Sequence, residues 1–249
     1  MLENVRTEVR RLVRQRGIGR RKALVFAEPL TPEQAIGRPS RKDYPIIKGK
    51  ERVLEARVLG ARGQAFTDSP CEFTGTVDGV LQLPFTSNRN RAIFVAVVNA
   101  LCRALGMAEG TVHCKDDEPE QCGSKIAAHI LERWGRVRVG LFGFNPAIAQ
   151  KLIRVFGRGR TRIADLDDDN IGSVKSGVKI EDGETASEDI IRWSDVCLIT
   201  GTTLLNGTFD SLAACAKRHG TDFLIYGMTV AGVSSLTGLP RQCYFGRNE

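Results

Sequence analysis

The sequence predicts an α/β fold, with a C-terminal Rossmann-like parallel sheet preceded by a smaller α+β domain. After residue 136, short apolar segments alternate with helical patterns, and such alternation requires parallel strands joined by right-handed crossovers. Before that residue, strand-like segments are followed by two long helical patterns, as in an α+β domain. We therefore expect two domains, residues 1–135 and 136–249, that meet at Gly135-Arg136.

Composition is that of an ordinary globular protein, with 42% hydrophobic and 26% charged residues in a chain of 249. No apolar run approaches the roughly 20 residues that span a bilayer. The first residues lack the apolar run and the cleavage site of a secretion signal. Seven cysteines without a regular spacing fit reduced thiols better than a disulfide framework. These features predict a cytoplasmic protein with no membrane partner.

Most of the formal charge of +7 comes from residues 1–22, which contain seven arginines and Lys22 but only two acidic residues, Glu3 and Glu8. The apolar residues of this segment fall on one helical face, which predicts an amphipathic helix with solvated arginines. The residues on that face are Leu2, Val5, Val9, Leu12 and Val13. Binding to a nucleic acid or another anionic partner stays open as the alternative.

The first domain is expected to begin with a small antiparallel sheet. Its predicted strands are residues 23–27, residues 52–59 and a strand pair over 73–83 that turns at Asp78-Gly79. Between the first two, residues 30–50 contain three prolines and predict a long surface loop.

Two helices are expected to complete this domain. Apolar residues at three- and four-residue spacing predict a helix over residues 88–105 that stops at Gly106. The second begins at a capping Asp117, with Glu120 reaching back as in a capping box, and runs to Trp134.

The second domain alternates strands and helices. The predicted strands are 137–142, 162–165, 196–199 and 223–226, the predicted helices are 146–157 and 208–220, and residues 182–194 are a polar connection with a weak helix.

A ligand site is expected at the carboxyl ends of two of these strands, where open parallel sheets bind ligands. The first loop offers hydroxyls and an amide, and the second ends the neighbouring strand, so we expect both to line one crevice. Their candidate ligand-binding residues are Thr200, Gly201, Thr202, Thr203 and Asn206 in the first, and Gly227, Met228 and Thr229 in the second. The alternative is that the hydroxyls only satisfy backbone groups where a helix starts.

The first strand-to-helix turn of this domain bears on nucleotide binding. The segment from Gly143 to Asn145 and the following proline lack the further glycines of a dinucleotide fingerprint, which disfavours NAD. Asp165 nevertheless ends the second strand, where a carboxylate would meet a ribose hydroxyl. Gly143, Asn145 and Asp165 are therefore candidate ligand residues, and a solvated acidic turn is the alternative for Asp165.

A metal site is predicted at His113, Cys114 and Cys122, because imidazole and thiolate are suitable ligands for zinc, copper or iron. The alternative is that these thiols pack as small apolar side chains. Cys71 is a weaker candidate for a fourth ligand. Packing is expected for three other cysteines, and Cys243 carries no prediction. The three are Cys102, Cys197 and Cys215.

Several segments together resemble the putative heavy-metal chelation family of Rossmann-like proteins. They are Gly63-Gln64-Ala65-Phe66-Thr67, the helix with Asn99-Ala100, and the stretches ITGTTLLNGT and YGMTVAGV, within residues 30–245. The resemblance implies a domain like the enolase N-terminal domain, followed by a Rossmann-like domain, with a site in the cleft between them. By position it places Phe66, Thr67, Asn99, residues 200–203, Asn206 and residues 227–229 at or near that cleft.

The leading hypothesis is binding of a transition or heavy-metal ion, or a small metal-associated anionic ligand, in an interdomain cleft. The second is an enzyme that acts on a nucleotide-like or phosphorylated small molecule. The third is a nucleic-acid or protein-binding module that uses the arginine-rich helix. The sequence leaves the presence of any reaction and of a homo-oligomer open.

Overall fold

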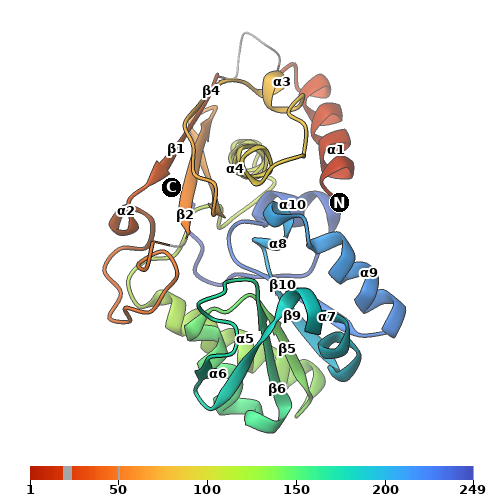
Figure 1. Cartoon of the computed structure of the whole chain (residues 1–249). Helices are drawn as coiled ribbons and strands as arrows, with labels where there is room; N and C mark the ends of the chain where they lie inside the picture. The colour runs from red at the N-terminus through yellow and green to blue at the C-terminus, as the bar shows by residue number, and fades with distance from the viewer. Residues whose placement is uncertain (19–23, 50, 249) are drawn as a thin grey trace.

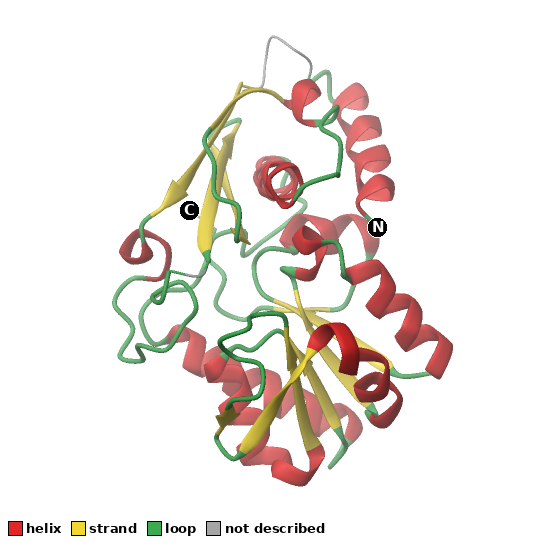
Figure 2. Ribbon diagram, viewed as in Figure 1, coloured by secondary structure: helices red, strands yellow, loops and turns green. Residues whose placement is uncertain are grey.

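A computed structural model describes residues 1–18, 24–49 and 51–248, and these residues form two β-sheets with helices around them (Figures 1 and 2). The smaller sheet is antiparallel and has the strand order β3-β2-β1-β4. The larger sheet has the order β11-β10-β9-β5-β6-β8-β7, and its strands are parallel except for β7. The predicted fold class, α/β with a Rossmann-like parallel sheet, is confirmed.

The smaller sheet contains β1 (Leu24–Leu30), β2 (Arg52–Val58), β3 (Ala61–Thr67) and β4 (Phe73–Thr76). Residues 61–67 lie outside the predicted strands, but they pair along their whole length with β2. At Gly63 this strand passes so close to the neighbouring helix that an added Cβ would lie 2.1 Å from the amide nitrogen of Ala100. The glycine therefore permits a backbone contact between sheet and helix.

The hairpin predicted at Asp78-Gly79 is wrong. After β4 the chain forms a single helical turn, α3 (Val77–Val80), instead of a returning strand. The hydroxyl of Thr76 accepts a hydrogen bond from the amide of Gly79 at 3.1 Å, which caps the turn. Local capping therefore outweighs the hairpin tendency of the Asp-Gly pair.

Residues 30–49, the described part of the predicted surface loop, contain a helix and buried side chains. They contain α2 (Pro32–Ile36), whose first turn is closed by a capping box between Thr31 and Gln34. Beyond this helix Tyr44 and Ile46 are buried. The part of the first predicted strand at Ala23 lies outside the described residues.

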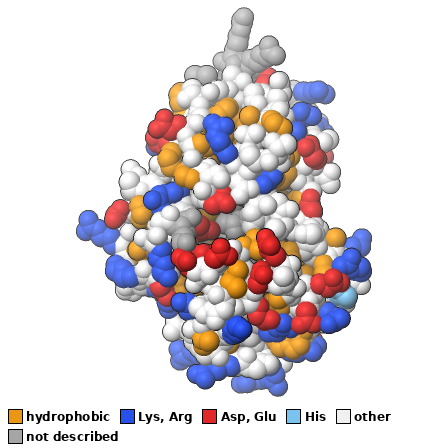
Figure 3. All heavy atoms as spheres, in the orientation of Figure 1, with side chains coloured by type: hydrophobic (Ala, Val, Ile, Leu, Met, Phe, Trp, Pro, Cys, Tyr) orange, Lys and Arg blue, Asp and Glu red, His pale blue; other side chains and the backbone are white. Residues whose placement is uncertain are grey.

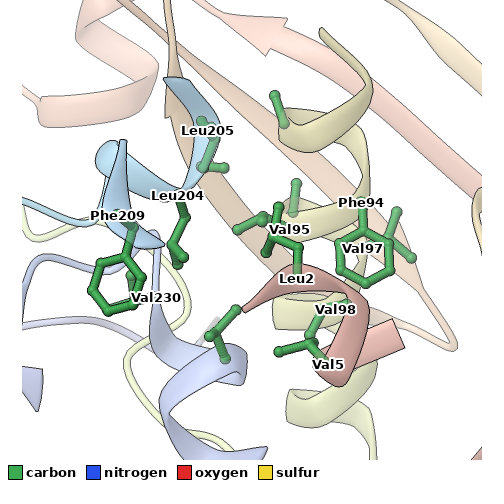
Figure 4. Close-up of a cluster of buried hydrophobic side chains, with 14 of the residues drawn as sticks. Leu2, Val5, Phe94, Val95, Val97, Val98, Leu204, Leu205, Phe209 and Val230 are labelled. Atoms are coloured by element: carbon green, nitrogen blue, oxygen red, sulfur yellow. The ribbon is translucent and has the colours of Figure 1, made fainter. Parts of the chain in front are cut away.

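The central helix of the small sheet is α4 (Asn88–Ala104), as predicted, and Ser87 caps its first turn. The amphipathic helix α1 (Leu2–Gln15) is also confirmed, and its apolar face packs beside α4 (Figure 4). Figure 4 shows side chains of α1 and α4 meeting Leu204, Leu205, Phe209 and Val230 from the C-terminal part.

The helix α5 (Glu118–Trp134) is confirmed, and Asp117 is its N-cap residue as predicted, but its side chain makes no capping hydrogen bond. The carboxylate of Asp117 accepts hydrogen bonds from the amide and hydroxyl of Ser40 rather than from its own helix. The side chain of Glu120 forms an ion pair with Arg41 instead of reaching back. Both acids therefore hold the loop after α2 against the start of α5.

The larger sheet contains the strands β5 (Val139–Phe142), β6 (Thr161–Asp165), β7 (Val174–Lys175), β8 (Val178–Asp182), β9 (Val196–Thr200), β10 (Asp222–Tyr226) and β11 (Arg241–Gln242). Numbered along the chain without the short β7, the parallel strands have the order 3-2-1-4-5-6, which is the order of a doubly wound dinucleotide-binding sheet. Successive strands are added on one side of β5 up to β8 and on its other side from β9 onward, and this reversal of strand order between β5 and β9 creates the switch point where such sheets bind ligands.

Helices cover both faces of this sheet (Figure 1). The connecting helices and turns are α6 (Pro146–Phe156), η1 (Arg158–Arg160), α7 (Gly183–Trp193), α8 (Thr203–Asn206), α9 (Phe209–His219) and α10 (Ala231–Thr237). One face packs against α5 and α6, and the other packs against α7 and α9. The polar segment 182–194, expected to hold a weak helix, is the end of a strand followed by the full helix α7.

One hydrophobic cluster includes residues from both the N-terminal and C-terminal parts of the chain, such as Phe94 and Phe209. The division into domains at Gly135-Arg136 therefore stays a prediction. None of the described helices has the length and apolarity needed to cross a membrane.

Candidate functional site

A cavity of about 860 Å³ lies at the carboxyl ends of β5, β6, β9 and β10. Its other walls come from β3, from the loop after α2 and from the start of α5. Of the residues predicted to bind a ligand, most line this cavity. They are Phe66, Thr67, Gly143, Asn145, Asp165, Thr200, Gly201, Thr202, Thr203, Asn206, Gly227, Met228 and Thr229. The structure therefore brings the two predicted loops to one hollow.

The three strand ends at the switch point are tied together by a few side chains. Gly143 follows β5 with a φ of +86°, and an added Cβ would lie 2.5 Å from the Cγ2 of Thr200. The hydroxyl of Tyr226 donates a hydrogen bond to the carbonyl of Gly143 at 2.8 Å. A glycine is needed here because only glycine combines this φ with so close a neighbour.

Residues 200–208, which we call the threonine loop, use several of their hydroxyls in hydrogen bonds within the loop. Thr203 donates to the carbonyl of Thr200 at 2.7 Å, and Thr202 donates to the Thr200 hydroxyl at 3.2 Å. Thr208 donates to the side-chain oxygen of Asn206 at 2.7 Å. The loop is therefore shaped by its own hydrogen bonds before any ligand enters.

Asp165 organises the turns around it. Its carboxylate accepts hydrogen bonds from the amide of Phe144 at 3.0 Å and from the side chain of Asn170 at 3.1 Å. It also accepts the amides of Leu166 and Asp167 at 2.7 and 3.1 Å. These four donors give the carboxylate a structural task that does not require a ribose.

Asn99 does not line the cavity and lies fully buried behind its wall. Its amide nitrogen donates to the carbonyls of Gln64 and Thr229, and its oxygen accepts from the amide of Gly232 at 2.7 Å. The side chain therefore positions the segment that follows β10, which itself lines the cavity.

The predicted metal donors His113, Cys114 and Cys122 all line the cavity. Burial lowers the pKa of His113 to about 4, so its imidazole is neutral at pH 7. Its Nδ1 faces the carbonyl oxygen of Cys114, and this contact assigns the ring proton to Nδ1. The lone pair of Nε2 is then available to a metal ion, which is the arrangement that most metal-binding histidines adopt.

The sulfur atoms of the cavity wall extend beyond the prediction, because Cys243 and Met228 also line it. Burial, with a smaller contribution from the nearby Cys243, raises the pKa of Cys114 and raises that of Cys122 to about 11. These thiols are therefore protonated at neutral pH, and a metal ion would have to displace their protons.

A different group of donors is the most compact among the described residues. Glu188, Cys215 and His219 each offer a ligand atom, and these atoms all lie within 4.8 Å of one another. The predicted trio of His113, Cys114 and Cys122 does not reach this spacing. The sequence signal for the compact group was the four-residue spacing of Cys215 and His219 in a helix, which places both on one face.

The charge of the cavity is strongly acidic, although the whole protein is basic. Among its described lining residues, six carry carboxylates and one, Arg218, carries a guanidinium. The six are Glu51, Asp68, Asp165, Asp167, Glu184 and Glu188. Figure 3 shows acidic side chains gathered along the waist of the molecule, between the parts that hold the two sheets. The lining thus has a formal excess of five negative charges.

Glu51 registers this charge most clearly. Burial and the neighbouring carboxylates of Asp165, Asp68 and Asp167 raise its pKa to about 7. A cation bound beside Glu51 would offset both the desolvation cost of its charged form and the repulsion from the neighbouring carboxylates. The ionised carboxylate therefore favours cation binding.

Three helices begin at the cavity, and their positive N-terminal ends oppose the negative charge of the lining. The starts of α6, α7 and α9 contribute Asn145, Gly183 and Thr208 to its lining. Each helix start carries about half a positive charge, so the three supply about 1.5 charges in total. This is smaller than the excess of five negative charges, and the cavity as a whole therefore favours cations.

Tyr44 contributes a polar atom that lacks a partner. Its side chain is only 5% exposed and lines the cavity, and its hydroxyl is bonded by no described residue. Burying an unsatisfied hydroxyl costs about 1–3 kcal/mol, so a ligand that bonds it would recover this energy. The sequence carried no signal for it, because Tyr44 lies in the segment expected to be a surface loop.

Part of the chain matches a known protein family. Residues 127–237 match the model of the family DUF364, described as putative heavy-metal chelation. The resemblance to this family is confirmed. The matched region covers the carboxyl ends of β5, β6, β9 and β10, and so includes much of the cavity wall.

Two solved structures are similar to the chain. A protein of unknown function from this family, from Pyrococcus horikoshii, has a TM-score of 0.53 and 12% identity, and the alignment covers 95% of this chain and 82% of that one. A second family protein of unknown function, from Desulfitobacterium hafniense, has a TM-score of 0.46 and 16% identity over 76% of this chain and 74% of that one. The first likeness supports the fold. No curated protein matches the chain.

Proposed function

We propose that the protein binds a metal cation, alone or as part of a small-molecule complex, in the cavity at the strand ends. The observation that carries the proposal is the lining charge, six carboxylates against one guanidinium. The description of the matching family as putative heavy-metal chelation agrees with it. If residues 1–135 and 136–249 are separate domains, as predicted, the cavity is the cleft between them.

Soft donors on one wall would hold the ion. The Nε2 of His113 and the thiols of Cys114 and Cys122 are the proposed ligands, and Cys243 is close enough to influence both thiols. Nitrogen and sulfur donors of this kind suit zinc, copper or iron. Because the three ligand atoms are spaced more widely than in a compact site, binding would draw α5 and the 113–114 segment together.

The size of the cavity supports an organic component. A volume of about 860 Å³ is typical of small-molecule sites and is far larger than a bare ion requires. The Tyr44 hydroxyl and the threonine loop would bond polar groups of that molecule. An anionic nucleotide on its own is disfavoured, since it would meet the acidic lining and an Asp165 that already accepts four hydrogen bonds.

The test is a Zn²⁺ titration read by alkylation of individual cysteines, with peptide mass spectrometry to assign each thiol. We expect Zn²⁺ to slow alkylation of Cys122 at least about tenfold. Cys71 is the matched control, because it is also partly exposed and does not line the cavity. Equal alkylation rates of Cys122 with and without Zn²⁺ would contradict the proposal.

A second measurement separates cations from anions. Zn²⁺ is expected to raise the melting temperature, because a ligand that binds the folded state stabilises it. Inorganic phosphate is expected to leave the melting temperature unchanged. A larger shift with phosphate than with Zn²⁺ would assign the cavity to an anionic ligand instead.

A further inference from the structure

Two helices of the C-terminal part bring three metal-binding side chains together. Cys215 and His219 lie one turn apart on α9, and Glu188 lies on the neighbouring helix α7. Their ligand atoms all lie within 4.8 Å of one another. The distance from His219 Nε2 to Glu188 Oε1 is 3.1 Å. One ion between them could contact all three atoms after small side-chain rotations.

The chemistry of the donors suits one class of ion. Sulfur, nitrogen and carboxylate oxygen are the three ligand types of zinc, which binds four ligands in a tetrahedron. Three protein ligands leave the fourth position to water or to another molecule, as in open zinc sites. His219 is the last residue of α9, and the negative end of a helix favours a cation there.

One of the three donors is buried, and the other two are exposed to solvent. The Cys215 residue is only 7% exposed, while the side chains of Glu188 and His219 are 63% and 26% exposed. Cys215 and Glu188 also line the cavity described above. The thiol therefore forms the inner end of the group, and the ion would be reached from solvent through the other two side chains.

One cation competes for this position. The guanidinium of Arg218 lies 3.3 Å from Glu188 Oε1 and its side chain is 64% exposed. An exposed ion pair of this kind contributes little to the stability of the fold, and salt screens it. A zinc ion bound to three ligands would therefore displace Arg218 from Glu188.

We infer that Glu188, Cys215 and His219 form a zinc site that is separate from the donors His113, Cys114 and Cys122. This goes beyond the proposed function, since it requires none of those three cavity donors. The ion at this place would link α7 to α9 and would stand beside the cavity, with its open position available to a ligand.

The test uses Co²⁺ as a spectroscopic substitute for zinc with the full chain. Tetrahedral Co²⁺ bound to a thiolate gives visible d–d bands and a sulfur-to-metal charge-transfer band in the near ultraviolet. We expect Cys215→Ser to remove one equivalent of bound Co²⁺ and the charge-transfer intensity that belongs to it. Cys122→Ser is the control, and it should retain that equivalent even if the proposed function is wrong.

Two further variants keep the test decisive if Cys215→Ser does not fold. Glu188→Gln and His219→Gln change exposed side chains, and each should weaken binding of this equivalent about tenfold or more. His129→Gln is the matched histidine control and should leave it unchanged. The inference is overturned if Glu188→Gln and His219→Gln bind Co²⁺ like the wild-type protein, or if Cys215→Ser binds as many equivalents of Co²⁺ as the wild-type protein with the same charge-transfer intensity.

Discussion

The side-chain oxygen of Asn99 accepts a hydrogen bond from the amide of Gly232 at 2.7 Å, and this contact joins α4 to α10. The amide nitrogen of the same side chain donates to the carbonyls of Gln64 and Thr229. One buried side chain therefore bonds backbone groups of β3, of the segment after β10 and of α10. A substitution here would affect the site through the fold.

We predict that Asn99→Ala lowers the free energy of unfolding by about 3 kcal/mol, because it leaves buried backbone groups without partners. Urea unfolding at pH 7 would measure it. Asn4→Ala, at an exposed position of α1, is the control and should change the value by less than about 0.5 kcal/mol. Similar losses for both variants would show that the buried hydrogen bonds contribute little.

A second prediction concerns Glu55, whose side chain is fully buried in β2. Burial alone would raise its pKa, but hydrogen bonds from Arg62 and Gln64 hold the pKa below its usual value. A carboxylate with a lowered pKa stabilises the folded state above its unfolded pKa of about 4.3, and this contribution is lost as the pH falls.

Glu55→Gln should therefore be less stable than the wild-type protein by about 2 kcal/mol at pH 7, and the difference should shrink towards pH 3. Urea unfolding of both proteins at several pH values measures the gap. A gap that is independent of pH would mean that the charge of Glu55 is not what stabilises the sheet.

A third prediction concerns Glu51, with its pKa of about 7 in the metal-free protein. A cation in the cavity favours the ionised carboxylate, so binding at pH 6 should release about 0.8 more protons from Glu51 than binding at pH 8. His113, already neutral above pH 6, adds nothing to this difference. The thiol of Cys122, with a pKa of about 11, contributes equally at both pH values.

Calorimetric Zn²⁺ titrations in buffers of different ionisation enthalpy measure the number of released protons. In Glu51→Gln the additional release at pH 6 should disappear. If the variant and the wild-type protein release the same number at each pH, the cation does not sense this part of the cavity.

A fourth prediction uses the unpartnered hydroxyl of Tyr44. Tyr44→Phe removes a buried oxygen that no described residue bonds, so the stability of the ligand-free protein should be unchanged or raised by up to about 1 kcal/mol. Thermal melting of the ligand-free variant and the ligand-free wild-type protein measures the effect, and a destabilised variant would show that the hydroxyl has a structural partner.

Periodic patterns predicted the parts of the fold that depend on a single buried face. The helices α1 and α4 could be predicted from their apolar spacing, which depends only on residues close in the sequence. The same holds for the strand, loop and helix that begin at Val196. Because parallel strands end at the same edge, the sequence also placed Thr202 and Thr229 beside one hollow, and both line the cavity.

The features that the sequence did not predict depend on contacts between distant segments. The carboxylate of Asp117 is used by Ser40 rather than by its own helix, which no local rule would show. Cys243 reaches the cavity only because β11 pairs with β10 at the edge of the sheet. Glu188 joins Cys215 and His219 only through the packing of α7 on α9.

The most direct test of cation binding is anomalous X-ray scattering from crystals soaked in Zn²⁺, with data collected on both sides of the zinc absorption edge. We predict an anomalous peak inside the cavity within coordination distance of His113 Nε2 and the thiols of Cys114 and Cys122. A cavity without such a peak in crystals that bind Zn²⁺ elsewhere would contradict the account.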